Sequence, residues 1–176
     1  MPANDDIFEF GKNIHALASY YLKGENIGKM KLTAQEEKVW NYLKNSKYFG
    51  YEVIGTELSL AVKVDGRFFG GRLDALVKED ETYYILDYKT GEPPKDAKYD
   101  YQTIIYVLAV KEFFNTENIV FVYLDLKNER EVKTVYAPNL YEEYKAKLIY
   151  TARKIENTGC TQKKADCKCE YTPICF

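Results

Sequence analysis

Hydrophobic and polar residues follow two different spacings along the chain. Apolar residues recur every three or four positions in four stretches, which predicts amphipathic helices over residues 4–24, 33–44, 99–114 and 139–155. Runs rich in β-branched and aromatic residues, bounded by glycine or polar turns, predict strands over residues 52–64, 67–78, 82–89, 118–126 and 131–136. Because the third helix separates the third and fourth strands, we expect an α/β fold with a mixed central sheet flanked by helices.

Length and composition indicate one globular domain. The chain has 176 residues, of which 46% are hydrophobic and 30% are charged, as in ordinary water-soluble domains. There is no 18-residue apolar run, and residues 1–10 contain acids instead of a basic apolar leader, so we expect a cytoplasmic protein without a membrane partner. We expect residues 1–157 to form the domain and residues 158–176 to form a cysteine-rich tail packed on it. The net charge of −2 disfavours a general nucleic-acid coat protein, but it allows a locally basic face.

The third predicted strand ends in the sequence Asp87-Tyr88-Lys89, which brings charge to a buried position. In a strand alternate residues share a face, so Asp87 and Lys89 point the same way and Tyr88 points away. A buried strand has no structural use for a carboxylate beside an ammonium unless another charge lies there. The structural alternative is a simple ion pair at the end of the strand.

Turn positions predict which acidic residues lie side by side. If Asp80 and Glu81 form the tip of a hairpin, Glu79 pairs with Thr82, and continuing this register places Asp74 opposite Asp87. The sequence Asp65-Gly66 predicts a second hairpin, whose register places Glu57 opposite Asp74 unless a bulge at Gly70-Gly71 shifts it. Opposed carboxylates repel each other, and a divalent cation between them would reverse that effect.

Together these motifs resemble the PD-(D/E)xK nuclease superfamily, and within it the RecB-like branch. The resemblance rests on four segments in the order of that branch: Gly11-Lys12-Asn13-Ile14-His15, then Asp74, then Asp87-Tyr88-Lys89-Thr90-Gly91, and then Gln102-Thr103-Ile104-Ile105-Tyr106. Each segment alone is a weak signal, and their combination and order make the resemblance specific. It implies a restriction-endonuclease-like core.

The resemblance also implies roles for particular residues. His15, Asp74, Asp87 and the carbonyl of Tyr88 would hold one or two Mg²⁺ or Mn²⁺ ions, with Glu57 as an outer carboxylate. Lys89 would orient or deprotonate the attacking water and stabilise the phosphate. Gln102 and Tyr106 would contact the substrate backbone or orient the lysine. For His15, the alternative is a histidine packed in the core beside the apolar face of its helix.

The expected function is that of a metal-dependent deoxyribonuclease, and more narrowly an exonuclease. It would hydrolyse DNA phosphodiester bonds at single-stranded or duplex ends, in recombination, repair or foreign-DNA processing, with recombination or CRISPR-type protein partners. The intact Asp74, Asp87 and Lys89 disfavour a noncatalytic subunit that only binds DNA ends or assembles with other proteins. That subunit and a nuclease acting on RNA remain the alternatives.

All four cysteines lie in the last 17 residues of the chain, at Cys160, Cys167, Cys169 and Cys175. In a reducing cytosol such clustering favours a metal site over disulfides, and thiolates select iron–sulfur clusters or zinc. Many RecB-like nucleases hold a [4Fe–4S] cluster at a similar place, with a fourth cysteine before the histidine helix. This chain has no cysteine before His15, and the Cys167–Cys169 spacing is one residue short. We therefore expect a [4Fe–4S] cluster or Zn²⁺, with unligated thiols as the alternative.

Overall fold

The computed structural model describes residues 4–157 of the chain, and the predicted cysteine site lies outside these residues. Within them the helices are α1 (Asn4–Leu22), α2 (Ala34–Lys44), α3 (Tyr101–Phe114) and α4 (Leu140–Asn157), with short 3₁₀ turns at Lys47–Gly50 and Ala97–Tyr99. The strands are β1 (Glu52–Val64), β2 (Arg67–Glu79), β3 (Thr82–Lys89), β4 (Ile119–Asp125) and β5 (Arg130–Val135). Every predicted helix and strand is present, with ends shifted by at most two residues. None of the described helices is long and apolar enough to cross a membrane.

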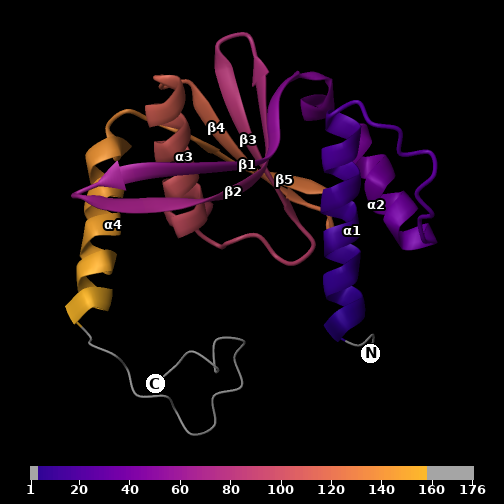
Figure 1. The fold of residues 1–176 in the computed structure, drawn as a ribbon, viewed down its shortest axis with the longest axis horizontal. Coiled ribbons are helices and arrows are strands. Elements are labelled where there is room, and N and C mark those ends of the chain that lie inside the picture. The colour runs from indigo at the N-terminus through magenta and orange to yellow at the C-terminus, as the bar shows by residue number, and fades with distance from the viewer. Residues whose placement is uncertain (1–3, 158–176) are drawn as a thin grey trace, which may run out of the picture.

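The strands form one five-stranded mixed sheet in the order β1-β2-β3-β4-β5 (Figure 1). Neighbouring strands are antiparallel except for β3 and β4, which are parallel and are joined through α3. A parallel pair needs a crossover connection, and α3 provides it. The predicted α/β fold with a mixed central sheet is therefore confirmed.

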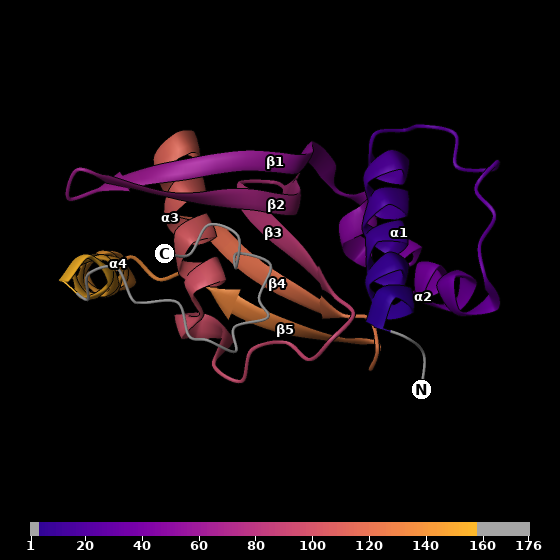
Figure 2. The same cartoon turned by 60° about the horizontal axis from the view of Figure 1, so that its bottom comes forward.

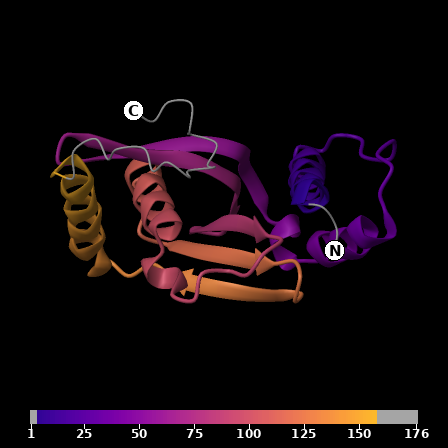
Figure 3. The same ribbon diagram turned by 90° about the horizontal axis from the view of Figure 1, so that it is seen from below.

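A hydrophobic core lies on each face of the sheet. On one face, Leu76 and Ile85 of the sheet pack with residues of α3 and α4. On the other face, Leu86 and Tyr88 pack with α1 and α2. The two helix pairs thus lie on opposite sides of the strands, as Figure 3 shows from below. Because Leu86 and Tyr88 belong to the second core, Asp87 between them points toward the α3 side.

The predicted strand registers hold except for a one-residue shift between Val53 and Gly55 of β1 and an early end of the β2–β3 ladder, and the second of these matters for function. Thr56 pairs with Ala75 and Leu58 with Leu73, so Glu57 lies level with Asp74, and neither Gly70 nor Gly71 shifts the register. The β2–β3 ladder runs from the Glu79–Thr82 pair and ends at the Ala75–Leu86 pair. The two strands separate just before Asp74 and Asp87, so these residues are not a cross-strand pair in the ladder.

The hairpin of β1 and β2 extends from the sheet across α3 to α4 (Figure 2). Its turn contains Asp65 and Gly66, both with positive φ, as the Asp-Gly sequence predicts. At this tip the Arg67 guanidinium donates two hydrogen bonds of 2.7 Å to Glu156 of α4. Arg153 of α4 also donates to Asp65, at 3.0 Å. These contacts fix the far end of the hairpin to α4.

Glu57 interrupts the regular backbone of β1. Its φ is 51°, in the left-handed region that residues with a Cβ rarely adopt. Such a conformation in the middle of a strand costs roughly 1–2 kcal/mol and is most often retained where a side chain must be aimed. The position of Glu57 level with Asp74 makes this strain informative about the site.

The strain at Glu57 can be measured by substitution. Glu57→Ala and Glu57→Gly both remove the carboxylate, but only glycine relieves the left-handed backbone. We expect the glycine variant to be the more stable of the two by about 1 kcal/mol in urea unfolding. Ser59, an exposed position of the same strand with no positive φ, provides the control. There Ser59→Gly should be less stable than Ser59→Ala. Equal or reversed stability at Glu57 would contradict the left-handed backbone.

Candidate active site

His15 is held between two elements of the sheet by both nitrogens of its ring. It lies on α1 beside Ile14, which is fully buried, while about 30% of its own side chain is exposed. Nε2 lies 2.9 Å from the Tyr88 carbonyl oxygen, and Nδ1 lies 3.1 Å from Asp74 Oδ1. Both neighbours are hydrogen-bond acceptors, so His15 is fixed by specific polar contacts. This arrangement differs from that of a histidine simply packed in the core.

The contacts of His15 also decide its charge. Burial alone lowers the pKa of His15, since it disfavours the imidazolium. The hydrogen bond and negative charge of Asp74, the Tyr88 carbonyl and the charge of Asp87 outweigh burial, and together they raise the pKa of His15 above its ordinary value. The surroundings of His15 therefore favour positive charge.

Asp74 lies where the β2–β3 ladder ends and takes over part of its hydrogen bonding. Its Oδ2 accepts a 2.8 Å hydrogen bond from the backbone N–H of Tyr88, which has no ladder partner on β2. Its Oδ1 faces His15. Only 16% of the Asp74 side chain is exposed. The carboxylate is thus fixed by contacts with two different elements.

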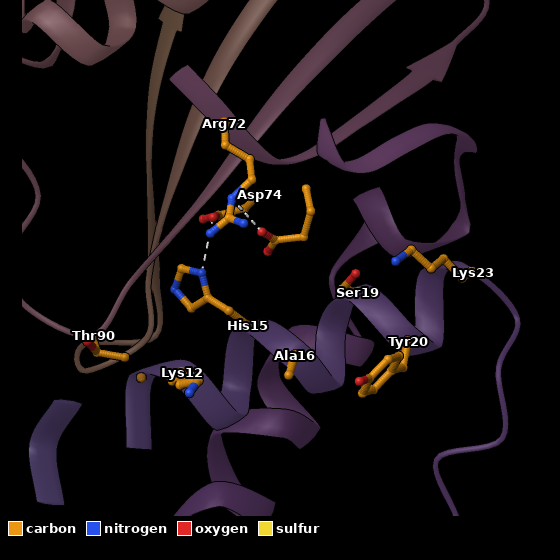
Figure 4. A pocket seen from close by; sticks show the side chains of 11 residues that line it. Lys12, His15, Ala16, Ser19, Tyr20, Lys23, Arg72, Asp74 and Thr90 are labelled. Carbon is orange, nitrogen blue, oxygen red and sulfur yellow. Dashed lines mark hydrogen bonds and ion pairs between the residues drawn. The ribbon is translucent and has the colours of Figure 1, made fainter. Parts of the chain in front are cut away.

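His15, Glu57 and Asp74 form a cluster of potential metal ligands. One side-chain ligand atom from each lies within 4.8 Å of the others. The cluster opens into a pocket of about 900 Å³ between α1 and the β1–β2 hairpin. Figure 4 shows His15 and Asp74 approaching each other across this pocket, with Arg72 above them. Two carboxylates and an imidazole are a donor set suited to Mn²⁺ and, through their oxygens, to Mg²⁺.

Asp87 belongs to a second group of side chains, on the α3 side of the cluster. Its Oδ1 accepts a hydrogen bond from the Gln102 amide, and the Lys89 ammonium donates to Gln102 Oε1 at 2.9 Å. Lys89 Nζ also lies 2.8 Å from Asp87 Oδ2. Asp87 and Lys89 therefore share a face, as their spacing predicts, and Gln102 joins them.

Asp87 carries a charge that the surrounding protein only partly compensates. Its side chain is 5% exposed, and Oδ2 is aligned with no hydrogen-bond donor among the described residues, although the Lys89 ammonium is close. Burial and the negative charge of Asp74 raise the pKa of Asp87 to about 6, against the opposing effects of Lys89 and His15. A buried carboxylate oxygen without an aligned donor, near the further carboxylate of Asp74, fits a site that receives a cation.

Tyr106 of α3 lies beside the cluster, where it contacts the backbone of β2 and the side chain of Gln102. Its hydroxyl donates a 2.8 Å hydrogen bond to the carbonyl oxygen of Arg72. Its ring lies so close to Gly71 that a Cβ at that position would be 2.8 Å from the ring. Gln102 thus contacts Asp87 and Lys89. Tyr106 packs against β2, the strand that carries Arg72 and Asp74.

The pocket contains cationic and aromatic residues to which the sequence motifs assign no role. Lys12, Tyr20 and Lys23 of α1 line it, and Arg72 projects into it from β2 (Figure 4). Arg72 could have been found from its spacing, because residues two apart on a strand share a face and Asp74 follows at that distance. The α1 residues recur at helical spacing after Lys12, but nothing in the sequence shows which helix face borders the pocket.

Comparison with solved structures supports the fold. The crystal structure of a protein named "Putative exonuclease" from Eubacterium rectale superposes with a TM-score of 0.57 and 14% sequence identity. The match covers 94% of this chain and 74% of the other. At this identity the likeness concerns the fold alone, and it agrees with the restriction-endonuclease-like core expected above. No curated protein matches the chain significantly.

Comparison with sequence families identifies the chain more directly. The sequence profile of the PD-(D/E)XK nuclease superfamily matches residues 21–176. The match includes Glu57, Asp74, Asp87, Lys89 and Gln102, whereas His15 precedes it. The geometry around Asp74 and Asp87 and the extent of this match lead to one conclusion: the chain belongs to the PD-(D/E)XK nuclease superfamily.

Proposed function

We propose that this protein is a metal-dependent deoxyribonuclease of the RecB-like type that works as an exonuclease on DNA ends. The observation that carries the proposal is the His15–Glu57–Asp74 cluster, which lines one pocket, with the Asp87–Lys89–Gln102 group near enough for the charges of Asp74 and His15 to act on Asp87. The name of the E. rectale protein, "Putative exonuclease", supports action at strand ends. Recombination, repair or foreign-DNA processing in the cytoplasm would use such an activity.

The residues that would hold a divalent cation are His15, Asp74, Asp87, the Tyr88 carbonyl and, as an outer ligand, Glu57. The unsatisfied Oδ2 of Asp87 and the clustered donor atoms of His15, Glu57 and Asp74 fit Mg²⁺ or Mn²⁺. When bound, such an ion would lower the pKa of water and neutralise charge that develops on the phosphate. His15 must present a neutral nitrogen to a metal, so metal and proton compete for it.

Lys89 is the residue proposed to act on the reacting phosphate. Its ammonium is held by Gln102 Oε1 at 2.9 Å and by Asp87 Oδ2 at 2.8 Å, so its position is set before substrate arrives. A fixed cation can stabilise negative charge on a phosphodiester and can orient a water for in-line attack. Gln102 acts through Lys89 and Asp87, because its hydrogen bonds fix the positions of both side chains.

The α1 side of the pocket is suited to a nucleic-acid strand. Lys12 and Lys23 can contact phosphates, and the partly exposed ring of Tyr20 can stack on a base. Asp74 and Asp87 are recessed, so the scissile phosphate must enter the pocket. This recess favours a single strand or a frayed end over the middle of a duplex.

The first test of the proposal is cleavage. Purified protein should degrade end-labelled single-stranded DNA in Mn²⁺ or Mg²⁺ and leave it intact in EDTA. Asp74→Asn and Asp87→Asn should each lower the rate by at least roughly a hundredfold, because each removes a charged ligand. Glu142→Gln, which removes an exposed carboxylate on α4, should cleave like wild type. Equal rates in all four proteins would refute the assignment of the site.

A second test separates Lys89 from the metal ligands. Lys89→Ala should keep its affinity for Mn²⁺ in calorimetry, yet lose roughly 10²–10³-fold in cleavage rate. The physical reason is that Lys89 acts on the phosphate, while the carboxylates hold the ion. If Mn²⁺ affinity were lost and cleavage kept, the two roles would be wrongly assigned.

A third test uses the uncompensated charge of Asp87. A carboxyl whose pKa is raised by folding destabilises the protein once it ionises, so Asp87 lowers the free energy of unfolding as the pH rises through about 6. At pH 7.5 without metal, Asp87→Asn should therefore melt about 2–4 °C higher than wild type. Mn²⁺ at one hundred times its Kd should stabilise wild type by about 2.7 kcal/mol and the variant much less.

Asp125 provides the matched control for Asp87. It is also a buried aspartate, but hydrogen bonds from Asn128 and Arg130 overcome the effect of burial and lower its pKa. Asp125→Asn should accordingly reduce the melting temperature. A decrease in both variants would mean that Asp87 is an ordinary structural carboxylate.

A further inference from the structure

Arg72 approaches the candidate ligands more closely than the other cations of the pocket. It projects from β2 into the space shared with His15 and Asp74 (Figure 4). Its Nε lies 2.8 Å from Oε2 of Glu57, one of the clustered candidate ligands, and 68% of the Arg72 side chain is exposed. Glu57 thus contacts the Arg72 guanidinium and is also one of the clustered candidate ligands for a metal ion.

We propose that Arg72 is a phosphate-binding residue whose guanidinium is paired with Glu57 in the absence of metal. A divalent cation at the cluster would break this ion pair and so free Arg72. Glu57 would turn from the guanidinium to the ion, and Arg72 would then bind a phosphate of the DNA strand. This proposal deepens the proposed nuclease function and rests on it. It makes Arg72 a substrate-binding residue and Glu57 the link between metal binding and DNA binding.

The charges favour this exchange. An exposed arginine–carboxylate pair contributes at most about 1 kcal/mol, so breaking it is easy. A divalent ion attracts the same carboxylate with twice the charge and is further held by His15 and Asp74. Once Glu57 turns away, Arg72 has no other ion-pair partner among the described residues. The strained backbone of Glu57, with φ of 51°, keeps its carboxylate level with Asp74, where both cations can reach it.

The anchoring of Arg72 supports motion of the side chain alone. Its backbone carbonyl accepts the hydrogen bond from Tyr106, and the ring of Tyr106 packs on Gly71. The guanidinium itself is mostly exposed and has five donors in a planar fork, the geometry that binds phosphate oxygens in pairs. Tyr106 is therefore a positioning residue for Arg72, in addition to its contact with Gln102.

A purely structural role for Arg72 makes different predictions. In that case its pair with Glu57 only joins β1 to β2, and its charge adds a general attraction for DNA. Loss of Arg72 would then weaken DNA binding by the same factor with and without metal. Under the proposal, the loss appears only when a metal has freed the guanidinium, because without metal Glu57 already occupies it.

The experiment is a double-mutant cycle on Arg72→Gln and Glu57→Gln. The Kd of a fluorescein-labelled phosphorothioate dT₁₂ is measured by anisotropy in EDTA and in Mn²⁺, with gels to confirm that the strand stays intact. In Mn²⁺, Arg72→Gln should weaken binding roughly tenfold, the effect of a lost charged hydrogen bond, with little change in EDTA. Glu57→Gln should tighten binding several-fold in EDTA, and the double variant should lose that gain.

Two controls make the cycle decisive. Lys23→Gln removes a cation of the same pocket that forms no ion pair with the described residues of the cluster, so it should weaken binding equally in EDTA and Mn²⁺. Calorimetry of Mn²⁺ without DNA should show equal or tighter affinity in Arg72→Gln, since Glu57 loses a competing partner. Melting curves confirm that each variant is folded.

The outcomes distinguish this inference from the proposed function. An equal loss in both conditions for Arg72→Gln, a gain from Glu57→Gln that survives in the double variant, or weaker Mn²⁺ affinity in Arg72→Gln would each overturn the release of Arg72. If the wild-type protein cleaves DNA and its variants give any of these results, the protein is a nuclease in which metal binding does not release Arg72 from Glu57. A wild-type protein that neither binds the strand nor cleaves DNA would refute the proposed function itself.

Discussion

The structure depends on the point where β2 and β3 separate. The ladder between them ends at the Ala75–Leu86 pair, so the N–H of Tyr88 lacks a backbone partner on β2. A buried donor without an acceptor is costly, and the Asp74 carboxylate meets this need at 2.8 Å. The same break frees the Tyr88 carbonyl to receive His15. A local failure of strand pairing thus brings a carboxylate, a carbonyl and an imidazole to one place.

The site around this break consists of two groups of carboxylates, each with its own cationic or polar partners. On the α1 side, two carboxylates are stabilised by His15 and Arg72, and on the α3 side Asp87 is stabilised by Lys89 and Gln102. Asp87 remains under-compensated, as its buried oxygen and its raised pKa both show. Sites that bind ions often hold such charges, because the ion supplies the missing compensation when it arrives. The stability given up at Asp87 fits a binding role.

The long β1–β2 hairpin connects this site to the rest of the domain. Its tip is fixed to α4 by Arg67 and Arg153, and its middle packs on α3 through Leu60 and Val62. With the tip and the middle of the hairpin held in this way, Glu57 and Arg72 face α1 across a pocket whose walls come from distant parts of the sequence. The hairpin therefore serves as a rigid wall, on which only side chains need to move.

The sequence alone determined the order of elements, the hairpin registers and the face shared by Asp87 and Lys89. These follow from local rules: periodicity, turn residues such as Asp65-Gly66, and alternation along a strand. Tertiary structure decided that the β2–β3 ladder ends at the Ala75–Leu86 pair and does not reach Asp74. It also decided that Glu57 takes a left-handed backbone and that Arg72 and Tyr106 border the cluster. Local sequence rules cannot predict these features, because each depends on contacts between elements that are distant in the sequence. The side chain of Asp74 is oriented by His15 of α1 and the Tyr88 N–H of β3, and that of Glu57 by Arg72 of β2.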